Sequence, residues 1–263
     1  MIKRTYIHLP GIGLRTEALF WRQGLATWED FLTVSRVNGL GPERLAWLKG
    51  LLQESLRHLH QPEYFASRLP AGELWRLFHH FRARTAYLDI ETTGAGWPEQ
   101  AVTVVGLYDG EAMRQFVLGQ NLLDFPETLA GVDVLVTFNG SLFDLPVLKA
   151  AFPDLVFPPL HLDLRFILAR LGHRGGLKRI EPRFGITRAP EVAGLNGFDA
   201  VLLWQRFQRG DQTAGKLLLQ YNQEDVLNLE ILMERAFELG EKQLLKGGSG
   251  VRPQVAAFTP GSR

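Results

Sequence analysis

The chain has 263 residues, of which 46% are hydrophobic, so it is long enough to bury a substantial core in one or two domains. It contains no cysteine, which excludes disulfide bonds and metal sites with cysteine ligands. The sequence has no apolar run long enough to span a bilayer, and it does not open with a secretory signal pattern. We therefore expect a cytoplasmic protein that does not associate with a membrane.

The net charge of +1 conceals an asymmetry between two parts of the chain. Residues 1–84 carry twelve Lys and Arg against seven Asp and Glu, a balance of +5, whereas residues 85–263 carry seventeen against twenty-one, a balance of −4. A basic flank beside an acidic portion fits a nucleic-acid-binding segment attached to a metal-binding body. Solvated surface charge explains the same numbers nearly as well.

Residues 1–84 have the pattern of helices separated by glycine turns at 9–13 and 38–42. These turns are similar to those of the helix-hairpin-helix family, which binds phosphates through backbone N–H groups. A tight glycine turn lets the backbone approach an anion at a helix start, so Gly11 and Gly13 are candidate nucleic-acid contacts. Plain helix connections would give the same pattern. The predicted helices cover residues 14–23, 27–32 and 42–60.

The stretch from Thr85 to Gly94 has the alternation of a β-strand. One side carries Ala86, Leu88 and Ile90, and the other carries Tyr87, Asp89 and Glu91. The period of two therefore places the Asp89 and Glu91 carboxylates on one face. Two neighbouring acids repel each other and resist desolvation, and a divalent cation would compensate them. A strand end that reaches solvent is the alternative explanation.

The pattern that follows predicts an α/β domain with a mixed sheet flanked by helices. An Asp109-Gly110 turn joins two strands as a hairpin, and a helix and a further buried strand come next. Three strands in one meander, with an acidic pair on the first, are typical of a ribonuclease H-like arrangement. The predicted strands are 101–108, 113–118 and 132–138, and the predicted helix is 122–129.

A further acid, Asp144, lies at the entry to a predicted helix over 143–151. Asn139 and Gly140 end the preceding strand, so Asp144 is placed near the strand ends, where α/β folds have their sites. A plain N-cap acid would occupy the same position.

The region from Arg165 to Arg188 contains seven Lys and Arg against the single acid Glu181. We predict a helix from His161 to Leu171, with Asp163 as a cap and not a ligand, and a second helix after a glycine turn. A basic helical pair beside an acidic site would suit a groove that follows a nucleic-acid backbone. A solvated helix face is the alternative. The candidate nucleic-acid contacts in this part of the chain are Asn139, Arg174, Lys178 and Arg179.

The longest predicted helix runs from Asp211, as N-cap, to about Leu239, and one of its faces carries an acid within an apolar stripe. An acid on a buried face is costly, so Asp225 requires a cation, either a metal ion or a buried salt-bridge partner. Tyr221 precedes it by one turn. The stripe consists of Leu218, Tyr221, Asp225, Leu229, Leu232 and Ala236.

Taken together, the three acidic clusters resemble the motifs of the DEDD 3′–5′ exonuclease superfamily, in its tyrosine-bearing branch. The clusters are D-I-E-T-T-G from Asp89, N-x-x-x-F-D ending at Asp144, and Y-N-x-x-D ending at Asp225. The resemblance covers about Thr85 to Leu239. A closer match is the YprB-like ribonuclease H-like family, which has a similar stretch from Gly176 to Arg188, and before it a histidine and an aspartate like His161 and Asp163.

The resemblance implies a metal-dependent 3′–5′ exonuclease that hydrolyses phosphodiester bonds of DNA or RNA with two Mg²⁺ or Mn²⁺ ions. Asp89, Glu91 and Asp225 would hold one ion, Asp89 would bridge to the second, and Asp144 would bind the second. Tyr221 would orient the attacking water. The expected partner is nucleic acid that is single-stranded or has a 3′ end. The alternatives are a catalytically idle nucleic-acid-binding module and a ribonuclease H-like endonuclease.

These patterns predict three parts of the chain. Residues 1–84 form a helical, helix-hairpin-helix-like segment, and residues 85–240 form the ribonuclease H-like exonuclease domain. Residues 241–263 are polar and rich in glycine, which predicts a disordered tail.

Overall fold

This computed structural model describes residues 1–94 and 101–248, which divide into two compact units. Among the described residues, the smaller unit is Met1–His60 with residues 239–248, and the larger unit is Gln61–Glu238. The division falls after His60, whereas the sequence predicted a boundary after residue 84. The short helices of residues 62–84 belong to the larger unit because they pack against the sheet, and Trp75 packs edge-on against Phe237.

The smaller unit contains the helices that the sequence predicted, and each begins at a residue suited to that position. The Thr27 hydroxyl accepts from the Asp30 amide, and the Asp30 carboxylate accepts from the Thr27 amide, which forms a capping box. Gly13 and Gly41 are the N-cap residues of the other two helices. The elements are η1 (Ile2–Arg4), α1 (Leu14–Arg22), α2 (Trp28–Thr33) and α3 (Pro42–Arg57).

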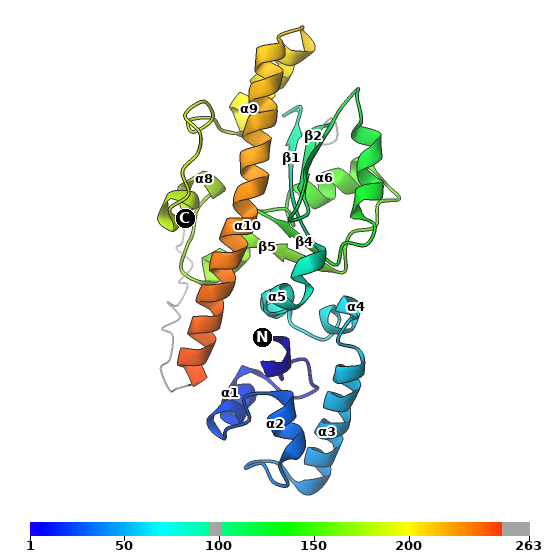
Figure 1. The fold of residues 1–263 in the computed structure, drawn as a ribbon, viewed down its shortest axis with the longest axis vertical. Coiled ribbons are helices and arrows are strands. Elements are labelled where there is room, and N and C mark those ends of the chain that lie inside the picture. The colour runs from blue at the N-terminus through cyan, green and yellow to red at the C-terminus, as the bar shows by residue number, and fades with distance from the viewer. Residues whose placement is uncertain (95–100, 249–263) are drawn as a thin grey trace, which may run out of the picture. The chain divides into compact units, whose positions relative to one another are not determined.

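The described part of the larger unit contains a five-stranded mixed sheet in the order β3-β2-β1-β4-β5 (Figure 1). Strand β1 pairs antiparallel with β2, which pairs antiparallel with β3, and the parallel strands β4 and β5 extend the sheet on the other side of β1. Strand β1 is therefore central. The strands are β1 (Thr85–Thr92), β2 (Val102–Tyr108), β3 (Met113–Val117), β4 (Val134–Thr137) and β5 (Leu160–Asp163).

Helices cover both faces of this sheet (Figure 1). On one face, Ala86, Leu88 and Ile90 of β1 pack in a core with residues of η4 (Leu122–Leu129) and α6 (Asp144–Ala151). On the other face, Val104 of β2 packs with residues of α9 (Gly197–Gln208) and α10 (Gln212–Gly248). The remaining elements are α4 (Pro62–Ala66), η2 (Ala71–Leu77), α5 (Phe78–Phe81), η3 (Arg82–Arg84), α7 (Leu164–Arg170), α8 (Leu177–Ile180) and η5 (Glu181–Phe184).

The structure corrects the sequence prediction at four elements. His161, predicted to start a helix, lies in β5, because residues 160–163 pair with β4, and the helix begins at Leu164. The helix over 122–129 is a 3₁₀ helix that contains a proline. Helix α9 was not predicted. Helix α10 begins after its Asp211 cap but extends to Gly248, so residues 241–248 are helical, whereas the rest of the predicted tail lies outside the described residues.

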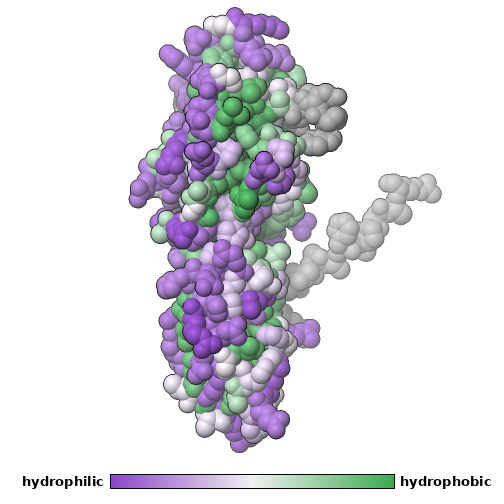
Figure 2. Space-filling view, turned by 90° about the vertical axis from the view of Figure 1, so that its right-hand side faces the viewer, coloured by the Kyte–Doolittle hydropathy of each residue, from purple (hydrophilic) through white to green (hydrophobic). Residues whose placement is uncertain are grey.

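The surface carries a mixture of hydrophilic and hydrophobic residues. On the face in Figure 2, hydrophilic residues predominate and hydrophobic ones form smaller patches between them. Exposed apolar side chains of the larger unit include Leu123 and Val156, and scattered residues of this kind are usual on protein surfaces. Within residues 1–94 and 101–248, no helix combines the length and the apolar content that a membrane span requires.

Candidate active site

The site begins with the two acids of β1, which the sequence placed on one face of this strand. Because alternate residues of a strand face opposite sides, burial of Ala86, Leu88 and Ile90 in one core turns Asp89 and Glu91 toward α10. Asp89 lies opposite Gly106 of β2, and the register of this pair shifts just after Glu91.

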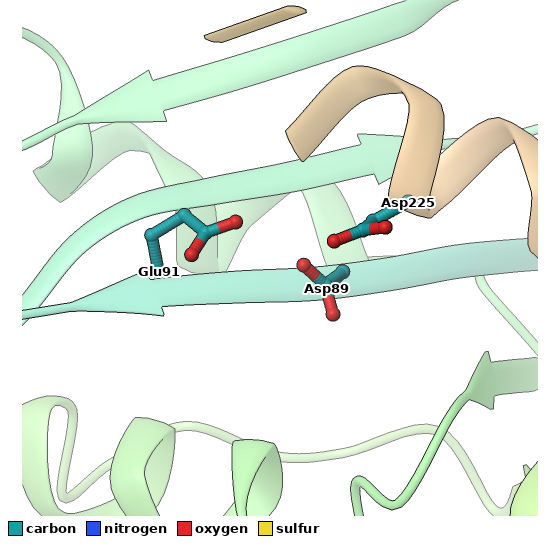
Figure 3. Close-up of side chains that lie close together, drawn as sticks. All are labelled: Asp89, Glu91 and Asp225. Carbon is teal, nitrogen blue, oxygen red and sulfur yellow. The ribbon is translucent and has the colours of Figure 1, made fainter. Parts of the chain in front are cut away.

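The third acid, Asp225, comes from α10 and completes a cluster. One carboxylate oxygen from each of Asp89, Glu91 and Asp225 lies within 4.8 Å of the others. Figure 3 shows Asp89 and Asp225 facing each other, with Glu91 further along β1. Residues that are 134 or more positions apart in the sequence thus meet at one point, because α10 packs on this face of the sheet.

Burial and mutual repulsion set the electrostatics of this cluster. Burial raises the pKa of Asp89 well above its usual value, and the charges of Asp225, Glu91 and Asp144 raise it further. Burial also raises the pKa of Glu91, as does the charge of Asp225. The pKa of Asp225 is raised by burial, although Lys178 and Arg188 oppose this shift. The bare cluster therefore favours protonated carboxyls, and a bound cation would reverse that preference.

The residues of the cluster fit a divalent metal ion. Glu91 is buried, and its Oε1 atom has no hydrogen-bond partner among the residues that the structure describes. A buried oxygen without a partner is costly, and an ion would satisfy it. All candidate ligand atoms are carboxylate oxygens, which are the hard ligands that Mg²⁺ and Mn²⁺ prefer.

A fourth acid, Asp144, shares a cavity with these three. The cavity has a volume of about 420 Å³, and Asp89, Glu91, Asp144 and Asp225 all line it. Asp144 stands outside the group whose oxygens lie within 4.8 Å of one another. Burial raises the pKa of Asp144 to about 7, although backbone hydrogen bonds at Asp144 and Ile90 oppose the shift.

Asp163 anchors the loop that precedes Asp144. Its Oδ1 atom accepts hydrogen bonds from the backbone N–H of Asn139, at 2.8 Å, and from that of Arg165, at 3.1 Å. Its Oδ2 atom accepts from the amide and the hydroxyl of Ser141, at 3.1 and 2.6 Å. Asp163 is thus the cap of α7, as predicted, and it also fixes the turn that brings Asp144 to the cavity.

Two cations lie beside Asp225, so the salt-bridge explanation of its burial describes part of the structure. Arg188 donates to Asp225 Oδ1, and Lys178 Nζ lies 3.7 Å from Asp225 Oδ2. Lys178 also donates to the hydroxyl of Tyr221, which lines the cavity. Burial and the charge of Asp225 raise the pKa of Tyr221, so its phenol is neutral.

The residues predicted to contact nucleic acid differ in their position relative to the cavity. Asn139 lines the cavity, has a φ of 70°, and accepts a hydrogen bond from Arg165. Arg174 and Arg179 are exposed and stand outside the described lining of the cavity. Gly11 and Gly13 are exposed turn residues of the smaller unit, where Gly11 has a φ of 76°.

Sequence reasoning missed one residue that holds the cluster in place. Asn222 is fully buried on α10, and its Nδ2 atom lies 3.3 Å from both the carbonyl and the Oδ2 atom of Asp89. Gln115 of β3 donates to Asn222 Oδ1 at 3.1 Å, which fixes the orientation of the amide. The signal that could have found it is its place beside Tyr221 in the Y-N-x-x-D motif.

Aromatic residues at the rim of the cavity were also not predicted. Phe143 and Phe198 line it from the loop before α6 and from the start of α9, and Phe198 is 68% exposed. No sequence pattern identified Phe198, because it lies on α9, the helix that was not predicted.

The strand order, the helices on both faces and the acids on β1 and α10 define an α/β domain of the ribonuclease H-like class. The family model described as RNase_H superfamily matches residues 86–237, and the chain belongs to this family. The matched region contains the sheet from Ala86 onward and all four acids of the cavity, Asp89, Glu91, Asp144 and Asp225.

Among solved structures, the chain is similar to the family B DNA polymerase from the hyperthermophilic archaeon Pyrobaculum calidifontis. The sequence identity is 19% and the TM-score is 0.45. The similar region covers 57% of this chain and 24% of the polymerase. No curated protein matches the sequence.

Proposed function

We propose that this protein is a metal-dependent 3′–5′ exonuclease that hydrolyses phosphodiester bonds of DNA or RNA. The observation that carries the proposal is the convergence of four buried or half-buried carboxylates on one cavity, with the Glu91 Oε1 atom left without a partner among the described residues. The order of the three motifs supports the tyrosine-bearing branch of the DEDD superfamily and the YprB-like family within it.

Asp89, Glu91 and Asp225 would hold one divalent ion, and Asp89 and Asp144 would hold a second. When bound, the two ions supply the charge that lowers the pKa of an attacking water and stabilises the leaving oxygen. The four carboxylates would hold these ions in the cavity. Three of them, Glu91, Asp144 and Asp225, are buried from bulk water. Asp144, with a pKa near 7, loses its proton in the neutral range and so becomes available as a ligand there.

Tyr221 would orient the attacking water. Its raised pKa keeps the hydroxyl protonated, so it is a hydrogen-bond donor or acceptor and not a general base. Lys178 donates to that hydroxyl and thereby fixes its direction.

The size of the cavity supports attack at a chain end. At about 420 Å³ it is in the range of pockets that take small ligands, about 300–1,000 Å³. Such a cavity suits a terminal nucleotide better than the interior of a duplex. The exposed Phe198 at its rim offers an aromatic face on which a base can stack.

The experiment is degradation of matched DNA and RNA oligonucleotides, labelled at the 3′ or the 5′ end, in Mg²⁺, Mn²⁺ or EDTA. A 5′ label should yield a ladder of products that shorten from the 3′ end, and EDTA, Asp89→Ala or Asp225→Asn should abolish it. Asp124→Asn, which changes an exposed acid of the same unit, should retain full activity. No degradation of any substrate in either metal would refute the proposal.

The same panel separates the alternatives. Cleavage of circular substrates would indicate an endonuclease. Binding that persists in EDTA, without cleavage in any metal, would indicate an idle binding module.

A further inference from the structure

Arg188 connects Asp225 to a second buried acid. The Arg188 side chain is 5% exposed, and its Nη2 atom donates both to Asp225 and to Glu181 Oε1, the latter at 2.5 Å. Its Nε atom donates to Glu181 Oε2 at 2.7 Å. One guanidinium thus makes a forked contact with Glu181 and a single contact with the acid of the cluster.

Helix α10 also binds Glu181 directly. Asn228, one turn beyond Asp225 on α10, donates to Glu181 Oε1 at 2.9 Å. Both oxygens of Glu181 are therefore occupied, and Glu181 is 2% exposed. The segment that contains Glu181 and Arg188 is bonded to α10 at Asp225 and at Asn228. Arg188 is therefore held in place on α10, and its bond to Asp225 constrains the direction of that carboxylate.

Stability is a poor explanation for this buried pair. Desolvation of two charges often costs as much as their attraction returns, and apolar replacements of such pairs are frequently neutral or stabilising. Arg188 also leaves its Nη1 atom buried without a partner within the described part of the chain, which is a further cost. The proposed catalytic steps use neither Glu181 nor Arg188, although both lie in the stretch from Gly176 to Arg188.

We propose that Arg188 is a positioning residue, fixed by Glu181, that presents the Asp225 carboxylate to the metal site. This inference rests on the proposed function. A carboxylate has two oxygens and about four lone-pair directions, so one bond from Arg188 to Oδ1 leaves Asp225 able to bind an ion. The planar fork of Arg188 suits this double contact, whereas the single ammonium of a lysine cannot reproduce it.

The test removes the contact without changing the net charge. In the double variant Arg188→Met with Glu181→Gln, one positive and one negative charge disappear together, and the glutamine retains an oxygen for Asn228. The matched control applies the same two substitutions to an exposed pair on α10, Arg235→Met with Glu238→Gln, whose charged atoms lie 3.3 Å apart. Mn²⁺ binding is measured by calorimetry without substrate, and activity is measured as a function of Mn²⁺ concentration.

We expect the double variant to bind Mn²⁺ about 10- to 100-fold more weakly, as is typical when a partner of a metal ligand is removed. The Mn²⁺ concentration for half-maximal activity should rise by a similar factor, while KM for the oligonucleotide stays unchanged. A purely structural role would lower the active fraction and the melting temperature without moving the Mn²⁺ dependence. The control variant should match the wild type in every measurement.

Equal or tighter Mn²⁺ binding by the double variant would overturn the positioning role and leave the proposed function intact. Absence of Mn²⁺ binding by the wild type would overturn both. If the double variant does not fold, Arg188→Lys serves in its place, because it keeps the charge and loses the fork. A Mn²⁺ requirement of Arg188→Lys equal to that of the wild type would likewise overturn the inference.

Discussion

Gly106 of β2 and Asn222 of α10 lie next to each other, and both are neighbours of Asp89. A Cβ atom on Gly106 would lie 2.2 Å from Asn222 Oδ1 and 2.7 Å from a methyl of Val226. Gly106 pairs with Asp89 across β1 and β2, and Asn222 contacts the Asp89 carboxylate. The absence of a side chain on one strand therefore lets α10 approach the acid on the next.

Gly106→Ala should impair the site although residue 106 does not itself contact it. The added methyl must displace Asn222 or α10, and overpacking of this kind costs about 1–3 kcal/mol. Denaturant unfolding should show that loss, and Mn²⁺ binding should weaken because Asp89 loses its amide partner. Gly194→Ala, in the same unit and with open space around its Cβ, should change neither. Wild-type Mn²⁺ affinity in Gly106→Ala would contradict the prediction.

Asp144 should make the metal-free protein less stable as the pH rises. Its folded-state pKa of about 7 lies above the unfolded value of about 3.9, so the folded state holds the proton over that interval. This contribution to stability is complete below the unfolded value and is lost as the pH approaches 7.

The check compares wild type with Asp144→Asn in EDTA by urea unfolding between pH 4 and pH 8. Asparagine cannot ionise, so its advantage over aspartate should grow by on the order of 3 kcal/mol across this range. A difference between the two proteins that does not vary with pH would refute the assignment of the shift to Asp144.

Metal binding should stabilise the folded protein, because the ion offsets the repulsion among the clustered carboxylates. Mn²⁺ at a hundred times its Kd should stabilise the folded protein by about 2.7 kcal/mol, because the unfolded chain lacks the site. The rise in melting temperature should be larger at pH 8 than at pH 5, since ligands must lose their protons to bind. Asp89→Asn should abolish the rise, and a rise that survives in this variant would place the metal elsewhere.

Tyr221→Phe should separate metal binding from turnover. The phenol is not a metal ligand in the proposed mechanism, so Mn²⁺ affinity should be unchanged. The rate should fall by about 100-fold, the scale expected when a reacting group is misplaced by about 1 Å. Tyr108→Phe, which removes an exposed hydroxyl bonded to the Gly110 carbonyl, is the matched control. A rate equal to that of wild type would remove Tyr221 from the mechanism.

Sequence patterns predicted the elements whose burial is regular. Strand β1 is apolar on one face, so its period of two was visible and placed Asp89 and Glu91 together. Asp225 was identified because it interrupts an apolar stripe on α10, and the other residues of this stripe are buried. Both predictions rest on local periodicity, which a single chain displays directly.

The remaining features depend on contacts between distant residues. Strand β5 has only four residues, two of them polar, and pairing with β4 decides its conformation. The bond between Arg188 and Asp225 spans 37 residues, and that between Asn222 and Asp89 spans 133. No local pattern specifies such pairs, because they exist only once α10 lies against the sheet.

The position of Asp225 on α10 has a consequence for the order in which the protein becomes competent during synthesis. The strands of the sheet and the acids Asp89, Glu91 and Asp144 all precede α10 in the chain, so they leave the ribosome before it. A nascent chain that has completed its sheet still lacks the third acid of the cluster. The proposed metal site is therefore complete only after α10 has emerged and docked, so an unfinished chain should lack the proposed nuclease activity.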